Sequence, residues 1–224
     1  LIPPGESQEK AEQSPIHFVN SIKKEETQES TEIKPENPFH PKELVEGKHV
    51  NKVTDAQGNI YEGNLVEGLY DGTGKFTSFD GKEVYEGEFV KGKYQGHGKL
   101  VKIISEKETW TYEGNFSEGL CKGKGKFIIS VVEEGNLIYE GDFANGQFEG
   151  QGILTLTYLE TQDIVESNVI VGITPEQDQL IKFNQMICNG TFIEGRMYGK
   201  GKITFSNGSV YEGFFINNKC IPAS

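Results

Sequence analysis

The sequence predicts an all-β protein: an elongated single-layer antiparallel β-meander of hairpins, preceded by an extended, mostly irregular N-terminal tail. Three observations predict this fold class. From Tyr61 onward, glycine, aromatic and charged residues recur at fixed positions in successive copies of one unit. Apolar and charged residues alternate within each copy with the period of a β-strand. Residues 1–45 show neither feature, so the chain divides into two parts.

The N-terminal tail, residues 1–45, is polar and contains six of the eight prolines. A segment with so few apolar residues buries too little surface to offset the entropy lost on ordering. We therefore expect its order to come from a contact, and we favour a partner protein over packing on its own repeats. Its small apolar clusters supply the candidate partner anchors, which are Ile16, Phe18, Ile22 and Phe39.

The repeat domain, residues 46–224, consists of units that begin with a tyrosine and carry glycine 2, 7, 11 and 13 positions later, as in Tyr61, Gly63, Gly68, Gly72 and Gly74. A half-repeat, residues 46–60, precedes the first complete unit. Further units begin at residues 85, 112, 139, 188 and 211, and the unit at 188 has cysteine in place of tyrosine. Position 4 is apolar in every copy.

Each unit predicts one β-hairpin with a ring-bearing inner face and a charged outer face. Positions 0, 2 and 4 share one side of a strand, whereas the glutamate at position 1 and the lysine at position 14 lie on the other. A turn about positions 7 and 8 would place position 4 opposite 11, position 2 opposite 13 and position 0 opposite 15. The two mid-strand glycines would then face each other, and rings could lie flat over the backbone.

Two kinds of interval depart from this period. The spacing rises to 27 residues from Tyr85 to Tyr112 and from Tyr112 to Tyr139, which predicts longer strand pairs that protrude at one edge. From Tyr139 to Cys188 the spacing is 49 residues. Residues 155–187 are therefore either one elongated hairpin, with Pro175 in its loop, or a decayed repeat.

Units of the form YEGxFxxGxxxGxGxF, repeated about every 23 residues over most of residues 58–219, resemble MORN repeats (membrane occupation and recognition nexus). The resemblance implies one hairpin per repeat, a slow twist and an aromatic-lined groove. The structural residues of that groove would be Tyr61, Gly63, Tyr85, Gly87, Phe89, Tyr112, Gly114, Phe116, Tyr139, Gly141, Phe143, Phe192, Tyr211 and Phe215.

Composition argues against several classes of function. The acidic residues are spread over repeat positions and His97 occupies an outward position, so we predict a protein that is not an enzyme, with no catalytic, metal or cofactor site. The net charge of −12 disfavours nucleic acid and anionic membranes. No apolar run approaches the roughly 20 residues of a spanning helix. The three cysteines are expected to be unpaired thiols, which fits a reducing, cytoplasmic compartment.

The resemblance favours a structural scaffold or adaptor that binds other protein subunits of a large complex. Several MORN-rich proteins belong to the cytoskeleton, including radial spoke heads of motile cilia and the cortical cytoskeleton of protists. We therefore expect a cytoskeletal location, with the cilium or axoneme as the specific expectation. The alternative is a membrane-associated, phospholipid-binding MORN module, and the negative charge argues against it.

Overall fold

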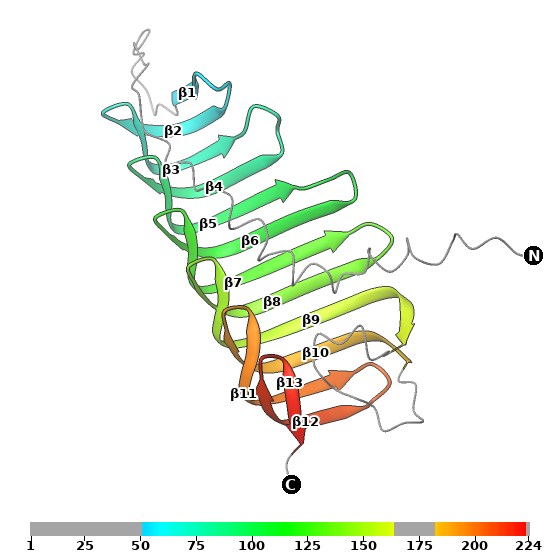
Figure 1. Ribbon diagram of the computed structural model, residues 1–224. Coiled ribbons are helices and arrows are strands. Elements are labelled where there is room, and N and C mark those ends of the chain that lie inside the picture. Colours follow the sequence, from blue (N-terminus) through cyan, green and yellow to red (C-terminus); the bar gives the residue numbers. More distant parts are fainter. Residues whose placement is uncertain (1–50, 164–181, 223–224) are drawn as a thin grey trace, which may run out of the picture.

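All thirteen strands of the computed structural model form one antiparallel sheet, in which each strand lies beside its neighbours in the sequence (Figure 1). The structure describes residues 51–163 and 182–222. The predicted all-β meander is confirmed. The strands are β1 (Asn51–Thr54), β2 (Ile60–Val66), β3 (Leu69–Thr77), β4 (Glu83–Val90), β5 (Lys93–Ile103), β6 (Glu108–Ser117), β7 (Leu120–Val131), β8 (Gly135–Ala144), β9 (Gln147–Asp163), β10 (Lys182–Ile193), β11 (Arg196–Phe205), β12 (Val210–Ile216) and β13 (Lys219–Pro222).

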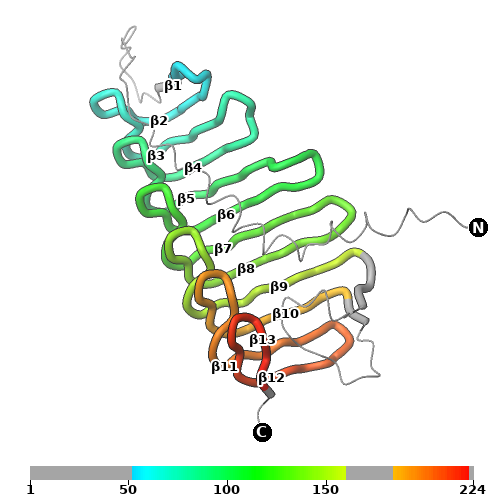
Figure 2. Tube along the Cα trace, in the orientation of Figure 1, coloured from blue at the N-terminus to red at the C-terminus, as the bar shows by residue number. Residues whose placement is uncertain are grey.

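The hairpins follow the predicted register over most of their length. In the hairpin of β2 and β3, Tyr61 lies opposite Phe76 and Gly63 lies opposite Gly74. The same two pairings recur in later hairpins, because every copy has its glycines at the same positions. The two-residue turns lie along one side of the sheet and the longer connections along the other (Figure 2).

One part of the predicted register is wrong. Position 4 does not face position 11 of its own hairpin, since Leu65 lies opposite Tyr70. The turn falls at positions 6 and 7, where Glu67 and Gly68 both have positive φ (52° and 79°), as the tight turns of twisted hairpins require. A bulge on β3 then takes up the extra residues, and Gly72 lies opposite Phe89 of the following hairpin instead.

The irregular intervals correspond to longer strands. β5, β6 and β7 have 11, 10 and 12 residues, compared with 7 in β2 and 9 in β3. Within the 49-residue interval, β9, with 17 residues, pairs directly with β10, so the described residues on either side of 164–181 form an antiparallel strand pair. Pro175 lies outside the described residues. At the N-terminal end, β1 pairs with β2 and supplies the strand expected in the half-repeat.

The core lies on one face of the sheet, which we call the inner face. It contains the tyrosines at position 0, the phenylalanines at position 4 and the apolar residues near position 15. The residues between them on each strand point to the opposite, outer face, because side chains alternate along a strand. A single sheet thus holds an apolar core on one side and a half-exposed polar surface on the other.

Candidate interaction surfaces

The first surface is the layer of rings on the inner face, which the glycine pairs make possible. The ring of Tyr112 lies over the opposed glycines Gly114 and Gly125, where a Cβ on Gly114 would come within 2.6 Å of both Tyr112 Oη and Gly125 Cα. The hydroxyl of Tyr112 donates a hydrogen bond to the Asn115 carbonyl (2.9 Å). Tyr61, Tyr85 and Tyr139 likewise donate to the carbonyl three residues further along the chain. In these four repeats only glycine leaves room for the ring.

Rings also connect each repeat to the next. Tyr85 stacks on Tyr94 within its own hairpin, with ring centroids 3.8 Å apart and an interplanar angle of 12°. It meets Phe116 of the following repeat edge to face at 5.1 Å. Tyr139 has the same arrangement, with Phe148 stacked at 3.9 Å and Phe192 edge to face at 5.1 Å. Aromatic pairs of this geometry contribute beyond their buried area, so adjacent repeats stabilise each other.

The repeat that begins at Cys188 keeps this packing with different side chains. Cys188 is 1% exposed in the tyrosine position, and the Met197 side chain lies over the glycine pair Gly190 and Gly201. A flexible thioether can fill the space that a ring fills elsewhere. All three cysteines are thiols, as expected from the sequence.

The residues predicted to line an aromatic groove lie together on the inner face, and their rings fill the space rather than leave it open. Nine of the ten rings in that set are at most 4% exposed: Tyr61, Tyr85, Phe89, Tyr112, Phe116, Tyr139, Phe143, Phe192 and Phe215. Tyr211, in the last repeat, is the exception and is half-buried. The anchors Ile16, Phe18, Ile22 and Phe39 lie outside the described residues.

Burial of the rings predicts a loss of stability in alkali. Burial raises the pKa of Tyr85 from 10.0 to about 12. It also raises the pKa of Tyr70 to about 12, with the nearby Asp55 carboxylate adding to the shift. The folded state favours the neutral rings, so their contribution is complete below pH 10 and declines as pH rises toward 12. We expect the denaturant midpoint to fall in this window, together with the appearance of tyrosinate absorbance. A midpoint that stays constant from pH 10 to 12 would contradict the burial of these hydroxyls.

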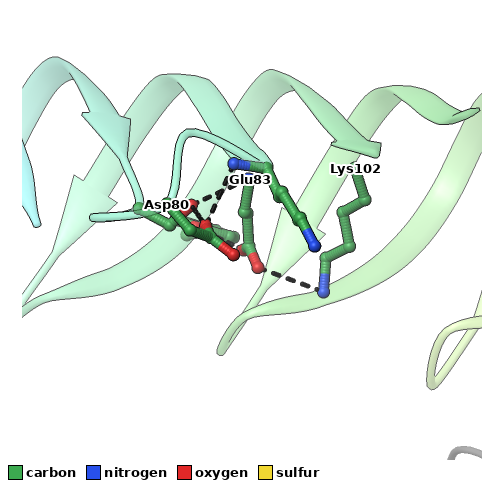
Figure 3. Close-up of polar contacts among 6 residues, drawn as sticks. Asp80, Glu83 and Lys102 are labelled. Atoms are coloured by element: carbon green, nitrogen blue, oxygen red, sulfur yellow. Dashed lines mark hydrogen bonds and ion pairs between the residues drawn. The ribbon is translucent and has the colours of Figure 1, made fainter. Parts of the chain in front are cut away.

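One row of the inner face is charged on β4 and β5 and apolar on β6 to β11. One row of cross-strand neighbours starts with Glu83 on β4 and Lys102 on β5. Their side chains form an ion pair (Glu83 Oε2 to Lys102 Nζ, 3.3 Å; Figure 3). The Tyr94 hydroxyl donates a hydrogen bond to Glu83 Oε1 at 2.9 Å. In the adjoining turn, Asp80 accepts hydrogen bonds from Ser78 Oγ and from the Lys82 N–H. The same row continues on β6 to β11 with apolar side chains: Trp110, Ile129, Leu137, Leu156, Met186 and Phe205.

This change separates two zones of the inner face. On β3 to β6, four apolar residues of the inner face that lie beside the buried rings are only half-buried: Phe76, Tyr94, Leu100 and Trp110. On β7 to β11 the row is at most 5% exposed, from Ile129 to Phe205. A partner that contacts the inner face would therefore meet accessible rings beside a polar pair in the first zone. We call it the half-exposed inner zone, defined by Phe76, Glu83, Tyr94, Leu100, Lys102 and Trp110.

The outer face carries an alternating row of charges that crosses the strands. From β1 to β8 the cross-strand neighbours are Lys52, Glu62, Lys75, Glu86, Lys99, Glu113, Lys126 and Glu140. The row is interrupted by Ile153 and Asn189 on β9 and β10, and it resumes with Lys202 and Glu212. Exposed pairs such as Lys126 and Glu140 (2.8 Å) contribute about 0–1 kcal/mol each. These ion pairs favour the correct register of neighbouring strands more than they add to the free energy of unfolding.

A second outer row, beside the charges, was not anticipated from the sequence. It occupies the positions just before each tyrosine and just after position 15, and every member is a β-branched residue. Such residues suit a half-buried pleated surface. The row consists of Ile60, Thr77, Val84, Val101, Thr111, Ile128, Ile138, Thr155, Ile187, Thr204 and Val210. Tabulating these two positions over the repeats would have found it.

Within residues 51–163 and 182–222, no group of three or more histidine, cysteine, aspartate or glutamate side chains is placed to hold a metal ion. His97 is exposed on the outer face opposite Asn115. In the part of the chain that the structure describes, no helix has the length and apolar character needed to cross a membrane.

Comparison with known proteins shows what the repeated unit is similar to. Five stretches match the family model described as MORN repeat, at residues 61–83, 85–102, 112–130, 139–157 and 188–210. Each match begins at the tyrosine position, or at Cys188 in its place. The search of curated proteins gives no match to the chain.

Proposed function

Because the chain contains five MORN repeats, we propose that it is a non-catalytic scaffold that holds other protein subunits in a large assembly. The observation that carries the proposal is the thirteen-stranded sheet in sequential order. At about 4.8 Å per strand, such a sheet forms a platform of roughly 60 Å whose repeats are linked by ring contacts. A platform of this kind suits the spacing of partners, and we propose a cytoskeletal assembly, with the radial spoke of the axoneme as the specific candidate.

The half-exposed inner zone is the surface that we propose for a partner. It offers accessible rings and the Glu83–Lys102 pair, a combination of apolar area and paired charge that suits protein contacts. Replacement of Trp110 by alanine should reduce partner binding while the repeats remain folded, because Trp110 is half-buried. The matched control is Thr111→Ala, which changes the neighbouring residue on the outer face. Equal losses of partner binding in both variants would contradict docking on the inner face.

A phospholipid-binding module is the alternative, and vesicle binding separates it from the scaffold. The outer row alternates lysine with glutamate, so it gathers no block of positive charge, and the whole chain carries −12. We expect the full chain to stay in solution with vesicles of phosphatidylserine and phosphatidylcholine at physiological salt, and to remain with the cytoskeletal fraction after detergent extraction. Co-sedimentation with the anionic vesicles but not with pure phosphatidylcholine would favour the membrane module.

The tail, which lies outside the described residues, supplies a further prediction about assembly. We propose that its apolar anchors carry affinity for a partner while the polar residues between them act as spacers. Joint replacement of Ile16, Phe18 and Ile22 by serine should weaken incorporation of the tagged chain into its native complex without shifting its thermal midpoint. Charge reversal at Glu25 and Glu29 is the matched control and should change little. A lower thermal midpoint for the triple variant would mean that the tail packs on its own repeats.

A further inference from the structure

The chain contains three pairs in which glycine follows asparagine, and all three lie among the described residues: Asn145–Gly146, Asn189–Gly190 and Asn207–Gly208. In such a pair the backbone nitrogen of the glycine can attack the side-chain amide of the asparagine. Glycine has no side chain to hinder this approach, and its backbone adopts many conformations. The reaction converts asparagine into an acid, so each pair is a candidate site of spontaneous modification.

In two of the pairs, the attacking nitrogen is held by another part of the sheet. Gly190 is buried in the middle of β10, which has a paired strand on each side. Gly146 lies in the two-residue turn between β8 and β9, and its N–H donates a hydrogen bond to the Cys121 carbonyl of the preceding repeat (3.1 Å). Attack by either nitrogen would require that contacts between strands or between repeats be broken first.

The third pair, in the exposed turn between β11 and β12, has its side chain folded toward the reacting nitrogen. The Ser209 N–H donates a hydrogen bond to Asn207 Oδ1 (2.9 Å). This bond closes an Asx turn, a ring of atoms that includes both Asn207 Cγ and the Gly208 nitrogen. It also draws electron density from the side-chain carbonyl, which favours attack on Cγ. The Gly208 N–H donates to the Phe205 carbonyl within the same turn (2.9 Å), so local opening of this exposed turn releases it.

The first repeat shows that a turn of this kind accommodates the acid. Asp80 and Asn207 both lie 19 positions after the start of their repeats. Asp80 Oδ1 accepts a hydrogen bond from the Lys82 N–H (3.0 Å), and the Gly81 N–H donates to the Ser78 carbonyl (2.9 Å). Hydrogen bonds from Ser78 Oγ and from the Lys82 N–H lower the pKa of the Asp80 carboxyl. A carboxylate at this position is therefore stabilised by the turn.

We propose that Asn207 is a site of spontaneous deamidation and that its turn retains the product as ordinary aspartate. The Gly208 nitrogen loses its proton to solvent base and forms a bond to Asn207 Cγ, and the side-chain nitrogen leaves as ammonia. Water then opens the resulting cyclic imide. Attack of water at Cγ breaks the new bond and gives aspartate, whereas attack at the backbone carbonyl breaks the original peptide bond and gives isoaspartate.

The hydrogen bonds of the turn select between these two products. Aspartate restores the original backbone, so its carboxylate accepts from the Ser209 N–H while the Gly208 N–H donates to Phe205 as before. Isoaspartate adds a carbon atom to the backbone inside a tight turn, which would disrupt both hydrogen bonds. Deamidation at Asn207 would thus add a negative charge between β11 and β12 while the fold is retained.

Mass spectrometry of the aged full chain tests the proposal. The folded chain and the chain unfolded in urea would be incubated at mildly alkaline pH, digested, and analysed by fragmentation that distinguishes aspartate from isoaspartate. In urea, the three asparagine–glycine pairs should react at similar rates, because each has the same two residues. In the folded chain, Asn207 is expected to react several-fold faster than Asn145 and Asn189, with aspartate as the main product.

Three results for the folded chain would overturn the proposal: a rate at Asn145 or Asn189 that equals or exceeds the rate at Asn207, no acid at position 207 after the urea sample has reacted, or isoaspartate as the main product there. Two variants test the product independently of the rate. Asn207→Asp is expected to keep the thermal midpoint of the wild type, whereas Asn207→Ala should lower it because the Ser209 N–H loses its acceptor. A midpoint for Asn207→Asp at or below that of Asn207→Ala would contradict retention of aspartate in the turn.

Discussion

Replacement of Gly114 by valine is expected to lower the free energy of unfolding by about 3 kcal/mol, because the new side chain has no room beneath the Tyr112 ring. Its Cβ would lie 2.6 Å from Gly125 Cα and from Tyr112 Oη, so the ring and the opposite strand would both have to move. Those groups also contact the next repeat, through the edge-to-face pair of Tyr112 and Phe143. Chemical denaturation of the full chain measures the loss.

Two comparisons make this prediction specific. Gly213→Val, in the last repeat, should cost less, because the short β13 arm that crowds it is held by one neighbouring strand and can shift. Thr111→Val changes a half-buried β-branched residue on the outer face and should alter the midpoint little. Equal losses for Gly114→Val and Gly213→Val, or a larger loss for the terminal glycine, would rule out this packing explanation.

Tyr139→Ala is expected to lower the free energy of unfolding by about 4 kcal/mol, the range found for removal of large buried aromatic side chains. Tyr139 is fully buried, stacks on Phe148 and meets Phe143 and Phe192 edge to face. Its removal would leave a cavity above the glycine pair at the centre of the array. Denaturant unfolding monitored by circular dichroism gives the value.

Tyr139→Phe separates the ring from its hydroxyl. The hydroxyl donates to the carbonyl of Asp142 at 3.1 Å and to that of Glu149 at 3.2 Å, and loss of such hydrogen bonds costs about 1 kcal/mol. The phenylalanine variant should therefore retain most of the stability that the alanine variant loses. Similar losses of unfolding free energy in the two variants would mean that the hydrogen bonds of the hydroxyl, rather than ring packing, account for the contribution of Tyr139.

The repeat period made most of the fold predictable. Glycines at fixed positions specify where two strands approach closely, so the pairs Tyr61–Phe76 and Gly63–Gly74 follow from the sequence. The pairing of position 4 did not follow, because the turn is set by backbone angles. Glu67 adopts a positive φ although it is not a glycine. The turn therefore lies at positions 6 and 7 rather than at 7 and 8, because the twist of the hairpin favours a tight turn with positive φ. The bulge at Gly72 then follows from the turn.

The interaction surfaces were less predictable than the fold. The change from Glu83 and Lys102 to Leu137 and Leu156 along one inner row depends on how far each hairpin extends, and the longer strands β5 to β9 break the repeat period there. This property does not belong to a single repeat, so the repeated pattern alone could not supply it.

An intramolecular distance between the two ends of the sheet tests the central claim most directly. Spin labels introduced through unnatural amino acids at Lys52 on β1 and Lys219 on β13, both exposed, would be measured in an excess of unlabelled chain so that only intramolecular distances contribute. Twelve strand spacings predict a single, narrow distribution near roughly 55 Å. A main distance below about 30 Å, far short of the sum of the strand spacings, would contradict one continuous open sheet.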